Sequence, residues 1–307
     1  FSLVRQTSPE LPVHISTQAN VTNYHSARFW QKQGAARVIA ARELSLKELA
    51  VIHHELPTLE SEAFVHGAMC ISYSGRCLLS NFMCGRDANR GDCAQPCRWK
   101  YHLVEEKRPG EYFPVIEDDT GTFIFNSKDL CMMEYIPELV QSGVTSFKIE
   151  GRMKSAFYVA TIVRAYRMAL DAYLADPLHY TFQPRWLQEV SKVSHRSFTT
   201  GFFVDKPGPE SQNYGTSTYI RTWEFVGVVR GYDESDGTLL IEQRNRILKG
   251  DEVEIVQPNG LDIPLTVGEM WDMEDNLITS APHPQMLLKI KLDQPVQKDS
   301  MLRKRNG

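Results

Sequence analysis

The sequence predicts an α/β protein, part of a TIM-type (β/α) barrel followed by a small antiparallel β-barrel domain. Up to about residue 200, short apolar runs alternate with helical segments at intervals of about 25 residues. Beyond about residue 220, the apolar runs alternate with polar residues and are separated by turns. A chain of 307 residues is also long enough for two domains.

The first strands and helices are expected from apolar runs near the start of the chain. Such runs in alternation with helical segments are typical of βα units, which build a parallel sheet. Ser45 stands directly before the second helical segment and belongs to the residue types that cap helices. The expected segments are strands at 13–17, 37–41 and 62–67 and helices at 24–33 and 45–56.

A fourth unit is expected from a strand at 144–151 and a helix at 154–174. Apolar residues recur at helical spacing along this helix, and Pro177 stands just past its end. A further helix is expected at 186–194. Four units make half of an eight-unit barrel and would leave two unpaired sheet edges, so we expect the first half of the barrel to precede Phe1.

The rest of the chain divides into a loop and a β domain. Residues 204–222 are polar and rich in Gly, Pro and Ser, which is typical of a linker or a binding loop. The runs EFVGVV, TLLIEQ, DEVEIV, IPLTV and LLKIKL follow as expected strands. The expected domains are a βα-barrel domain at 1–203 with a cysteine-rich insertion at 68–131, the linker at 204–222 and a small β-barrel domain at 223–307.

The composition is that of an ordinary globular protein, with 42% hydrophobic and 23% charged residues. A net charge of −4 argues against a general nucleic-acid coat protein but leaves a local basic surface open. The chain has no apolar stretch long enough to cross a membrane, and its start lacks the build of a secretory signal. We therefore expect a cytoplasmic protein without a membrane partner, in which thiols stay reduced.

Five of the six cysteines lie between residues 62 and 100, among glycines and arginines. Cys70, Cys77, Cys93 and Cys97 are separated by six, fifteen and three residues. Glycine gives the backbone the freedom to bring such thiols together around an iron–sulfur cluster, and nearby arginines favour the thiolate. Zinc prefers two closely spaced pairs, and only Cys93 and Cys97 fit one. Packing of the thiols as small apolar groups is the alternative.

The sequence resembles peptidase family U-32, the collagenase-like peptidases, in blocks that come in the usual order of that family. They are EAFVHGAMCISYSGRCLLS at 62–80, NSKDL at 126–130, SFKIEGRMKS at 146–155 and QNYG at 212–215. The resemblance runs from the first strand to about residue 220. It is strongest to the bacterial proteins that hydroxylate tRNA uridine with prephenate. It implies a partial or complete βα barrel ahead of a small β-barrel domain.

The resemblance also implies an enzyme of tRNA modification. Such proteins convert the wobble uridine of certain tRNAs to 5-hydroxyuridine, so tRNA is the expected partner and prephenate the expected co-substrate. Members of the wider family carry a 4Fe–4S cluster on four cysteines. Carried over to this chain, the ligands are Cys70, Cys77 and Cys93, with Cys97 as the fourth and Cys131 as its alternative.

Site residues are expected where strands end, because in a βα barrel the carboxyl ends of the strands face the active site. His66 lies at the end of the third run and Glu150 and Arg152 at the end of the fourth, so these three are the expected catalytic residues. A salt bridge between Glu150 and Arg152 is the structural alternative. Phosphates and unstacked bases require cations and aromatic rings. The expected substrate-binding residues are Lys148, Arg152, Lys154, Arg98, Trp99, Gln212, Asn213 and Tyr214.

Two further basic stretches are candidates for contact with RNA phosphates. One includes Arg164 and Arg167, and the other comprises Arg303, Lys304 and Arg305 at the end of the sequence. Solvated surface charge is the plainer interpretation of both.

Two other functions stay open. A U-32-type peptidase would cleave collagen-like or unfolded chains, although the sequence identifies no nucleophile with its base. A non-catalytic subunit would act only together with a paralogous chain.

Overall fold

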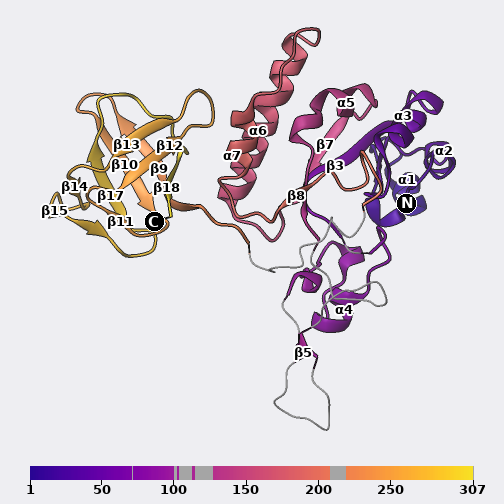
Figure 1. The fold of residues 1–307 in the computed structure, drawn as a ribbon, viewed down its shortest axis with the longest axis horizontal. Helices are drawn as coiled ribbons and strands as arrows, with labels where there is room; N and C mark the ends of the chain where they lie inside the picture. The colour runs from indigo at the N-terminus through magenta and orange to yellow at the C-terminus, as the bar shows by residue number, and fades with distance from the viewer. Residues whose placement is uncertain (71, 100–101, 104–112, 115–126, 208–218, 307) are drawn as a thin grey trace. The chain divides into compact units, whose positions relative to one another are not determined.

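A computed structural model of the chain describes residues 1–70, 72–99, 102–103, 113–114, 127–207 and 219–306 (Figure 1). The chain divides into two compact units. The first comprises Phe1–Lys154, Tyr166–Leu187 and His195–Tyr219, and the second comprises Ser155–Ala165, Gln188–Ser194 and Ile220–Gly307. In the described part of the chain, no helix is long and apolar enough to cross a membrane.

The first unit is built on four parallel strands, as the sequence predicts. They are β1 (His14–Ile15), β2 (Arg37–Ile39), β3 (Glu60–Ala68) and β7 (Ser146–Ile149). Each of β2 and β7 pairs with β3 in parallel, and β1 pairs with β2 in parallel. The βα units therefore follow one another across the sheet in chain order.

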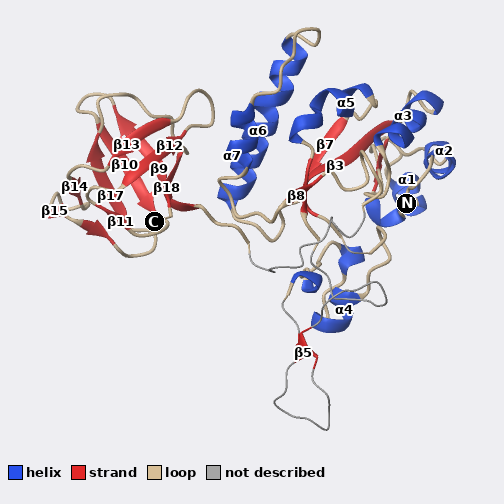
Figure 2. Ribbon diagram, in the orientation of Figure 1, coloured by secondary structure: helices blue, strands red, loops and turns tan. Residues whose placement is uncertain are grey.

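Helices of the first unit follow the strands, and Figure 2 shows how the two alternate. They are α2 (Tyr24–Lys32), α3 (Leu46–Glu55) and α5 (Ile136–Gln141), and α1 (Ser2–Thr7) precedes the first strand. The helices α6 (Ala156–Ala175) and α7 (Pro184–Val190) each contribute residues to both units. The cap at Ser45 is confirmed: its Oγ accepts the N–H of Glu48 at 3.3 Å, and Glu48 Oε2 accepts the N–H of Ser45 at 2.8 Å.

Two strands of the sheet were not expected from the sequence. β6 (Asp129–Cys131) pairs antiparallel with the end of β3, where His66 lies opposite Cys131, and β8 (Phe198–Thr199) pairs in parallel with β6. The sheet is therefore mixed, and the expected insertion contributes a strand to it. Among the described strands, β1, β7 and β8 each have one pairing partner, and closure into a TIM-type barrel stays a prediction.

The cysteine-rich segment forms short elements. They are α4 (Leu79–Cys84), two 3₁₀ turns at Ala88–Arg90 and Pro96–Arg98, and the two-residue strands β4 (His102–Leu103) and β5 (Phe113–Pro114). Gly75 holds the start of this segment against Gln18, because a Cβ at Gly75 would lie 2.2 Å from the Gln18 carbonyl oxygen. Its φ of +79° also favours glycine.

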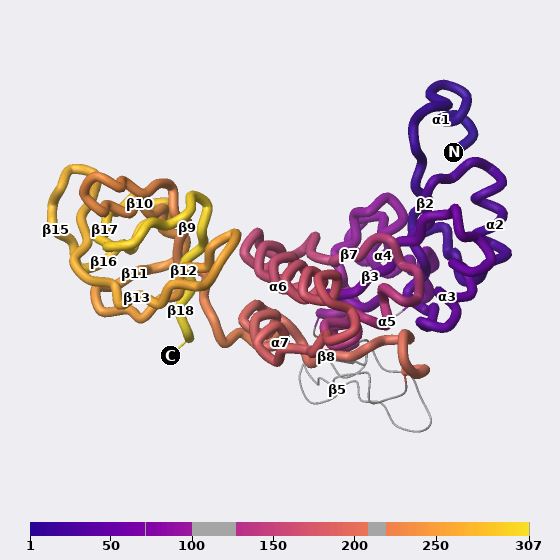
Figure 3. Tube along the Cα trace, turned by 90° about the horizontal axis from the view of Figure 1, so that it is seen from above, coloured from indigo at the N-terminus to yellow at the C-terminus, as the bar shows by residue number. Residues whose placement is uncertain are grey.

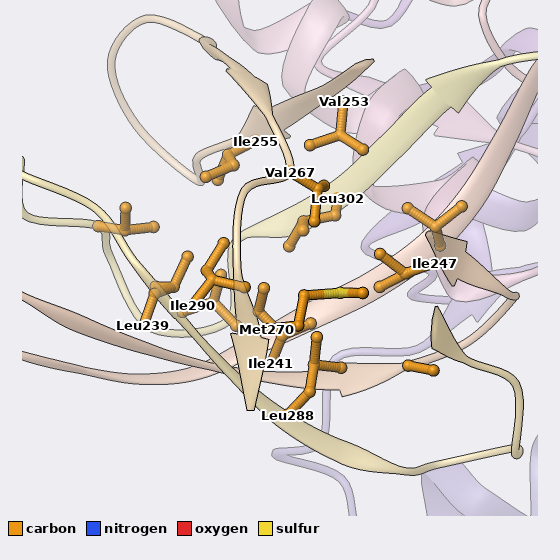
Figure 4. Close-up of a cluster of buried hydrophobic side chains, with 14 of the residues drawn as sticks. Leu239, Ile241, Ile247, Val253, Ile255, Val267, Met270, Leu288, Ile290 and Leu302 are labelled. Atoms are coloured by element: carbon orange, nitrogen blue, oxygen red, sulfur yellow. The ribbon is translucent and has the colours of Figure 1, made fainter. Parts of the chain in front are cut away.

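The second unit contains an eight-stranded antiparallel sheet, which confirms the expected small β domain. The strands are β9 (Trp223–Asp233), β10 (Thr238–Gln243), β12 (Glu252–Val256), β13 (Ile263–Thr266), β14 (Met270–Trp271), β15 (Leu277–Ile278), β17 (Leu287–Lys291) and β18 (Met301–Arg305), and β11 (Ile247–Leu248) pairs with β16 (Ser280–Ala281) outside that sheet. Figure 3 shows the strands curling around one interior, and Figure 4 shows side chains that fill it. Leu239, Ile241, Ile255 and Leu302 are buried there, because every second residue of a strand faces the core.

A buried ion cluster in the second unit corrects the expectation of a basic stretch at its end. Arg303 is completely buried, and its guanidinium binds Glu189 at 3.0 Å, Asp262 at 2.9 Å and Glu254 at 2.9 Å. Lys304 binds Asp251 at 2.9 Å. The prediction that Arg303 offers its charge to RNA phosphates is therefore wrong, because carboxylates of the fold already neutralise it.

Candidate functional site

The carboxyl ends of β3 and β7 lie side by side, which brings the expected catalytic residues to one place. The N–H of Glu150 donates to the His66 carbonyl oxygen at 2.9 Å. At Gly67, with φ of +108°, a Cβ would lie only 2.3 Å from the Glu150 carbonyl oxygen, so glycine is required there. In open α/β sheets this edge is where ligands bind.

His66 lies in the interior below this edge. The ring is 1% exposed, and its Nδ1 lies 3.3 Å from the Tyr166 hydroxyl. That hydroxyl donates to the Val65 carbonyl and accepts the N–H of Met132, so His66 Nδ1 is the donor toward it. Burial lowers the pKa of His66 to about 3, against the opposing effect of Asp129, so the imidazole is neutral near pH 7.

Glu150 and Arg152 do not interact in the way that was expected from the sequence. Glu150 Oε1 accepts the backbone N–H of Arg152 at 3.0 Å, a local turn contact rather than a salt bridge. Arg152 is exposed, and its Nη2 lies 3.9 Å from the position that a Cβ would take on Gly91. The Arg152 side chain therefore reaches the cysteine-rich segment.

The two lysines expected to bind substrate contact other side chains of the first unit. Lys148 Nζ lies 2.8 Å from Glu62 Oε1 on the neighbouring strand. Lys154 Nζ lies 3.9 Å from the centre of the Tyr219 ring, a cation–π contact. Gln212, Asn213 and Tyr214 lie outside the described residues.

Arg98 lies in the interior, where it connects the cysteine-rich segment to the sheet. Its Nη1 lies 2.6 Å from Asp129 Oδ1, and its Nη2 donates to the Met69 carbonyl oxygen at 3.3 Å. Asp129 Oδ2 also accepts the N–H of Arg196 at 3.0 Å. A guanidinium held in this way is an internal support, whereas the neighbouring Trp99 is 47% exposed.

The four cysteines first expected as ligands lie close enough for their thiols to influence one another. Burial raises the pKa of Cys97 to about 11, and Cys70, Cys93 and Cys77 raise it further, against the effect of Arg98. Burial likewise raises the pKa of Cys70, and Cys77 and Cys93 add to the effect. All six cysteines are free of disulfides.

Cys131 has different neighbours. It lies in β6, where burial raises its pKa to about 11 and the carboxylates of Glu134 and Asp129 contribute. Cys70, Cys77 and Cys93 are not among the main influences on the pKa of Cys131. The choice between Cys97 and Cys131 as the fourth ligand stays a prediction.

The four cysteines are thiol donors of the kind that an iron–sulfur cluster uses, and the presence of a cluster stays a prediction. Within the described residues, no three His, Cys, Asp or Glu side chains lie close enough together to hold one ion. A four-iron cluster is wider than an ion and holds its thiolates farther apart. Burial raises the pKa values of Cys70 and Cys97, and the cations of Arg42 and Arg98 respectively offset part of that rise, which favours the thiolate form that binds iron.

Hydrogen bonds fix the cysteine-rich segment to the ends of the strands. Ser74 N–H donates to Glu43 Oε1 at 2.8 Å, and Ser74 Oγ accepts the N–H of Arg42 at 3.3 Å. Within the segment, Ser80 Oγ accepts the N–H of Ala94 at 2.9 Å. Ser74, which lies between Cys70 and Cys77 in the sequence, is therefore fixed to the residues that follow β2.

Arg42 and Asp129 were not expected to belong to the site. Arg42 comes shortly after β2, so the rule that sites form at strand ends could have identified it. Asp129 could not be found in this way, because β6 is too short to be recognised from its pattern.

A separate hollow of about 810 Å³ lies in the second unit, on the outer side of β10, β14 and β17. Tyr232, Leu240, Trp271 and Met273 line it, together with Asp233, Glu234, Asp236, Asp275, Lys289 and Lys291. None of the residues expected from the sequence as site residues lines this hollow.

Two family models match consecutive parts of the chain. Residues 1–213 match peptidase family U32, and residues 221–303 match the peptidase family U32 C-terminal domain. The crystal structure of the C-terminal domain of a U32 family protein from Geobacillus thermoleovorans is 36% identical and covers 26% of this chain and 99% of that chain, with a TM-score of 0.26.

Curated relatives cover most of the chain. The tRNA hydroxylation protein P1 of Bacillus subtilis is 42% identical, with 98% of this chain and 71% of that protein covered. The tRNA hydroxylation protein P of Escherichia coli is 35% identical, with coverages of 99% and 75%. A collagenase of Porphyromonas gingivalis is 32% identical, with coverages of 80% and 61%. The chain belongs to peptidase family U32.

Proposed function

We propose that this chain takes part in tRNA modification, the hydroxylation of wobble uridine to 5-hydroxyuridine with prephenate as co-substrate. One observation supports the proposal: Cys70, Cys77 and Cys93 act electrostatically on Cys97 in the segment that follows β3, in a chain that two tRNA hydroxylation proteins match over nearly its full length. Strand ends in α/β proteins are a common location of catalytic sites.

In this proposal Cys70, Cys77, Cys93 and Cys97 hold a 4Fe–4S cluster. When bound, such a cluster supplies electron transfer. Ser74 and Arg98 position the segment that carries these ligands, and Arg98 adds positive charge beside Cys97. Arg152, exposed near Gly91, is available to a phosphate or a carboxylate. Trp99 is 47% exposed and is the aromatic residue assigned to an unstacked base.

The proposal also includes the finer fold. The parallel order β1, β2, β3, β7 with intervening helices is that of consecutive units of a TIM-type barrel. We therefore place the site at the mouth of such a barrel.

The test is the nucleoside composition of tRNA from a strain that lacks the gene. Wild-type chain and the Cys84→Ser variant should restore 5-hydroxyuridine, measured by mass spectrometry, whereas Cys77→Ser should not. Cys84 is the matched control because it lies in the same segment and is not among the proposed ligands. Restoration by Cys77→Ser at the wild-type level would contradict the proposal.

Peptidase activity is the second candidate, favoured by the likeness to the collagenase. Its weakness is the absence of a suitable base at His66, whose pKa of about 3 is far from neutral. A peptidase would cleave gelatin after its iron is removed, and cleavage would be abolished by one nucleophile substitution. A non-catalytic subunit, the third candidate, would restore the modified nucleoside only when a paralogous chain is added.

A further inference from the structure

Arg42 stands at the carboxyl end of β2, beside the cysteine-rich segment. Its backbone is fixed by the hydrogen bond to Ser74 Oγ, and its guanidinium carbon lies 3.9 Å from the centre of the Phe64 ring on β3. The side chain is only partly exposed. Stacking on Phe64 therefore holds the guanidinium in one orientation without using its N–H groups.

The N–H groups of this guanidinium have no acceptor within the described residues. No hydrogen bond or ion pair of the Arg42 side chain occurs there. By contrast, Arg37 binds Glu60 at 2.6 Å and Glu62 at 3.3 Å, and Arg98 binds Asp129. Arg42 thus differs from Arg37 and Arg98, whose guanidinium groups are paired with carboxylates.

The nearest carboxylates are engaged elsewhere. Glu43 accepts both the N–H and the hydroxyl of Ser74, and Glu150 accepts the N–H of Arg152. Both carboxylates act on Arg42 electrostatically without bonding to it, as does the thiol of Cys70. A partly buried, oriented guanidinium with unused donors is the arrangement that recognises an external anion.

We propose that Arg42 is the anion-binding residue of this site and holds a carboxylate of the small-molecule co-substrate beside Cys70. A guanidinium binds a carboxylate through two parallel N–H···O bonds, and Phe64 leaves both donors free to do so. This inference deepens the proposed function, because prephenate carries two carboxylates. The binding site itself does not depend on the reaction.

The test is the affinity of the purified 307-residue chain for prephenate in the absence of tRNA, measured by calorimetry. Arg42→Gln should weaken binding by about 10- to 100-fold, the range for a lost charged hydrogen-bonded pair. Arg42→Lys should recover part of the affinity, because it keeps the charge and loses the paired geometry. Arg28→Gln, which removes an exposed partner of Glu55, is the matched control and should bind as wild type.

The outcomes show whether Arg42 binds a carboxylate or a phosphate. They also distinguish failure of this proposal from failure of the proposed function. Prephenate affinity within twofold of wild type in a folded Arg42→Gln variant would overturn the inference. A loss of tRNA affinity alone, measured by filter binding, would also overturn it and assign Arg42 to a phosphate. If Arg42→Gln weakens prephenate binding while the strain that lacks the gene still contains wild-type levels of 5-hydroxyuridine, the proposed binding site is supported and the proposed reaction is rejected. Near-ultraviolet circular dichroism verifies that each variant is folded.

Discussion

Arg98 and Asp129 form an ion pair in the interior of the first unit, with 2.6 Å between Nη1 and Oδ1 and side chains 4% and 1% exposed. The pair connects the residue that follows Cys97 to strand β6. Burial alone would raise the pKa of Asp129, but Arg98 and the N–H of Arg196 hold it below its ordinary value. The position of the fourth proposed ligand therefore depends on a carboxylate in the sheet.

We expect Asp129→Asn to destabilise the first unit by about 3–5 kcal/mol, because it leaves the buried Arg98 cation without its counter-charge. Urea denaturation would measure the loss. Asp171→Asn removes an exposed partner of Arg167 and should change stability by less than about 0.5 kcal/mol. Equal effects of the two substitutions would argue against the role given to the buried pair.

Gly67→Ala is expected to be far more costly than Gly85→Ala. Both glycines have positive φ, +108° and +65°, but nothing lies within 4 Å of a Cβ at Gly85. The left-handed backbone alone costs alanine about 1–2 kcal/mol, so Gly85→Ala measures that term. At Gly67 the Glu150 carbonyl oxygen must also move. Thermal unfolding of both variants compares the two losses of stability. Similar losses would show that the Glu150 carbonyl can move away from position 67 at little cost.

Iron content should distinguish Cys97 from Cys131. After anaerobic purification, we expect Cys97→Ser to lose most of its iron and visible absorbance, while Cys131→Ser and Cys84→Ser retain both. The reason is that Cys97 is influenced by the other proposed ligands, whereas Cys131 is influenced by Glu134 and Asp129. Loss of iron in Cys131→Ser with retention in Cys97→Ser would reverse the assignment.

Acid should weaken the second unit through Glu189. Burial raises the pKa of this carboxyl, but its bonds to Arg303 and the nearby cations outweigh burial and lower it overall. A depressed pKa in the folded state adds stability that is complete above the unfolded value, about 4.3, and is lost as the pH falls below it. Denaturation between pH 6 and pH 3 should show a shallower decline for Glu189→Gln than for wild type, and identical slopes would contradict this.

Elements with a local signal could be predicted from the sequence. Ser45 and Glu48 form a capping box within four residues, and the apolar run of β3 is long enough to be recognised. The short strand β6 carries no usable periodicity, and its pairing with β3 joins distant parts of the chain.

The candidate site could be predicted only in part, because the contacts that shape it join residues far apart in the sequence. The cysteines stand out because their spacing in the sequence is unusual. Whether an arginine is exposed depends on partners far along the chain: Arg98 is neutralised by Asp129 and Arg303 by Glu189. Arg42, in contrast, stands out because its guanidinium has no hydrogen-bond acceptor in the part of the chain that the structure describes, and a sequence cannot show this.

The hollow on the second unit limits how a polyanion can approach that part of the protein. Lys289 and Lys291 lie there at 2.6 Å from Asp275 and 2.7 Å from Asp236, so their charges are already compensated. Asp233 and Glu234 then leave the rim negative. Phosphodiester chains are repelled from such a face at low ionic strength. A nucleic acid that touches this β domain is therefore expected to do so on a different side of it.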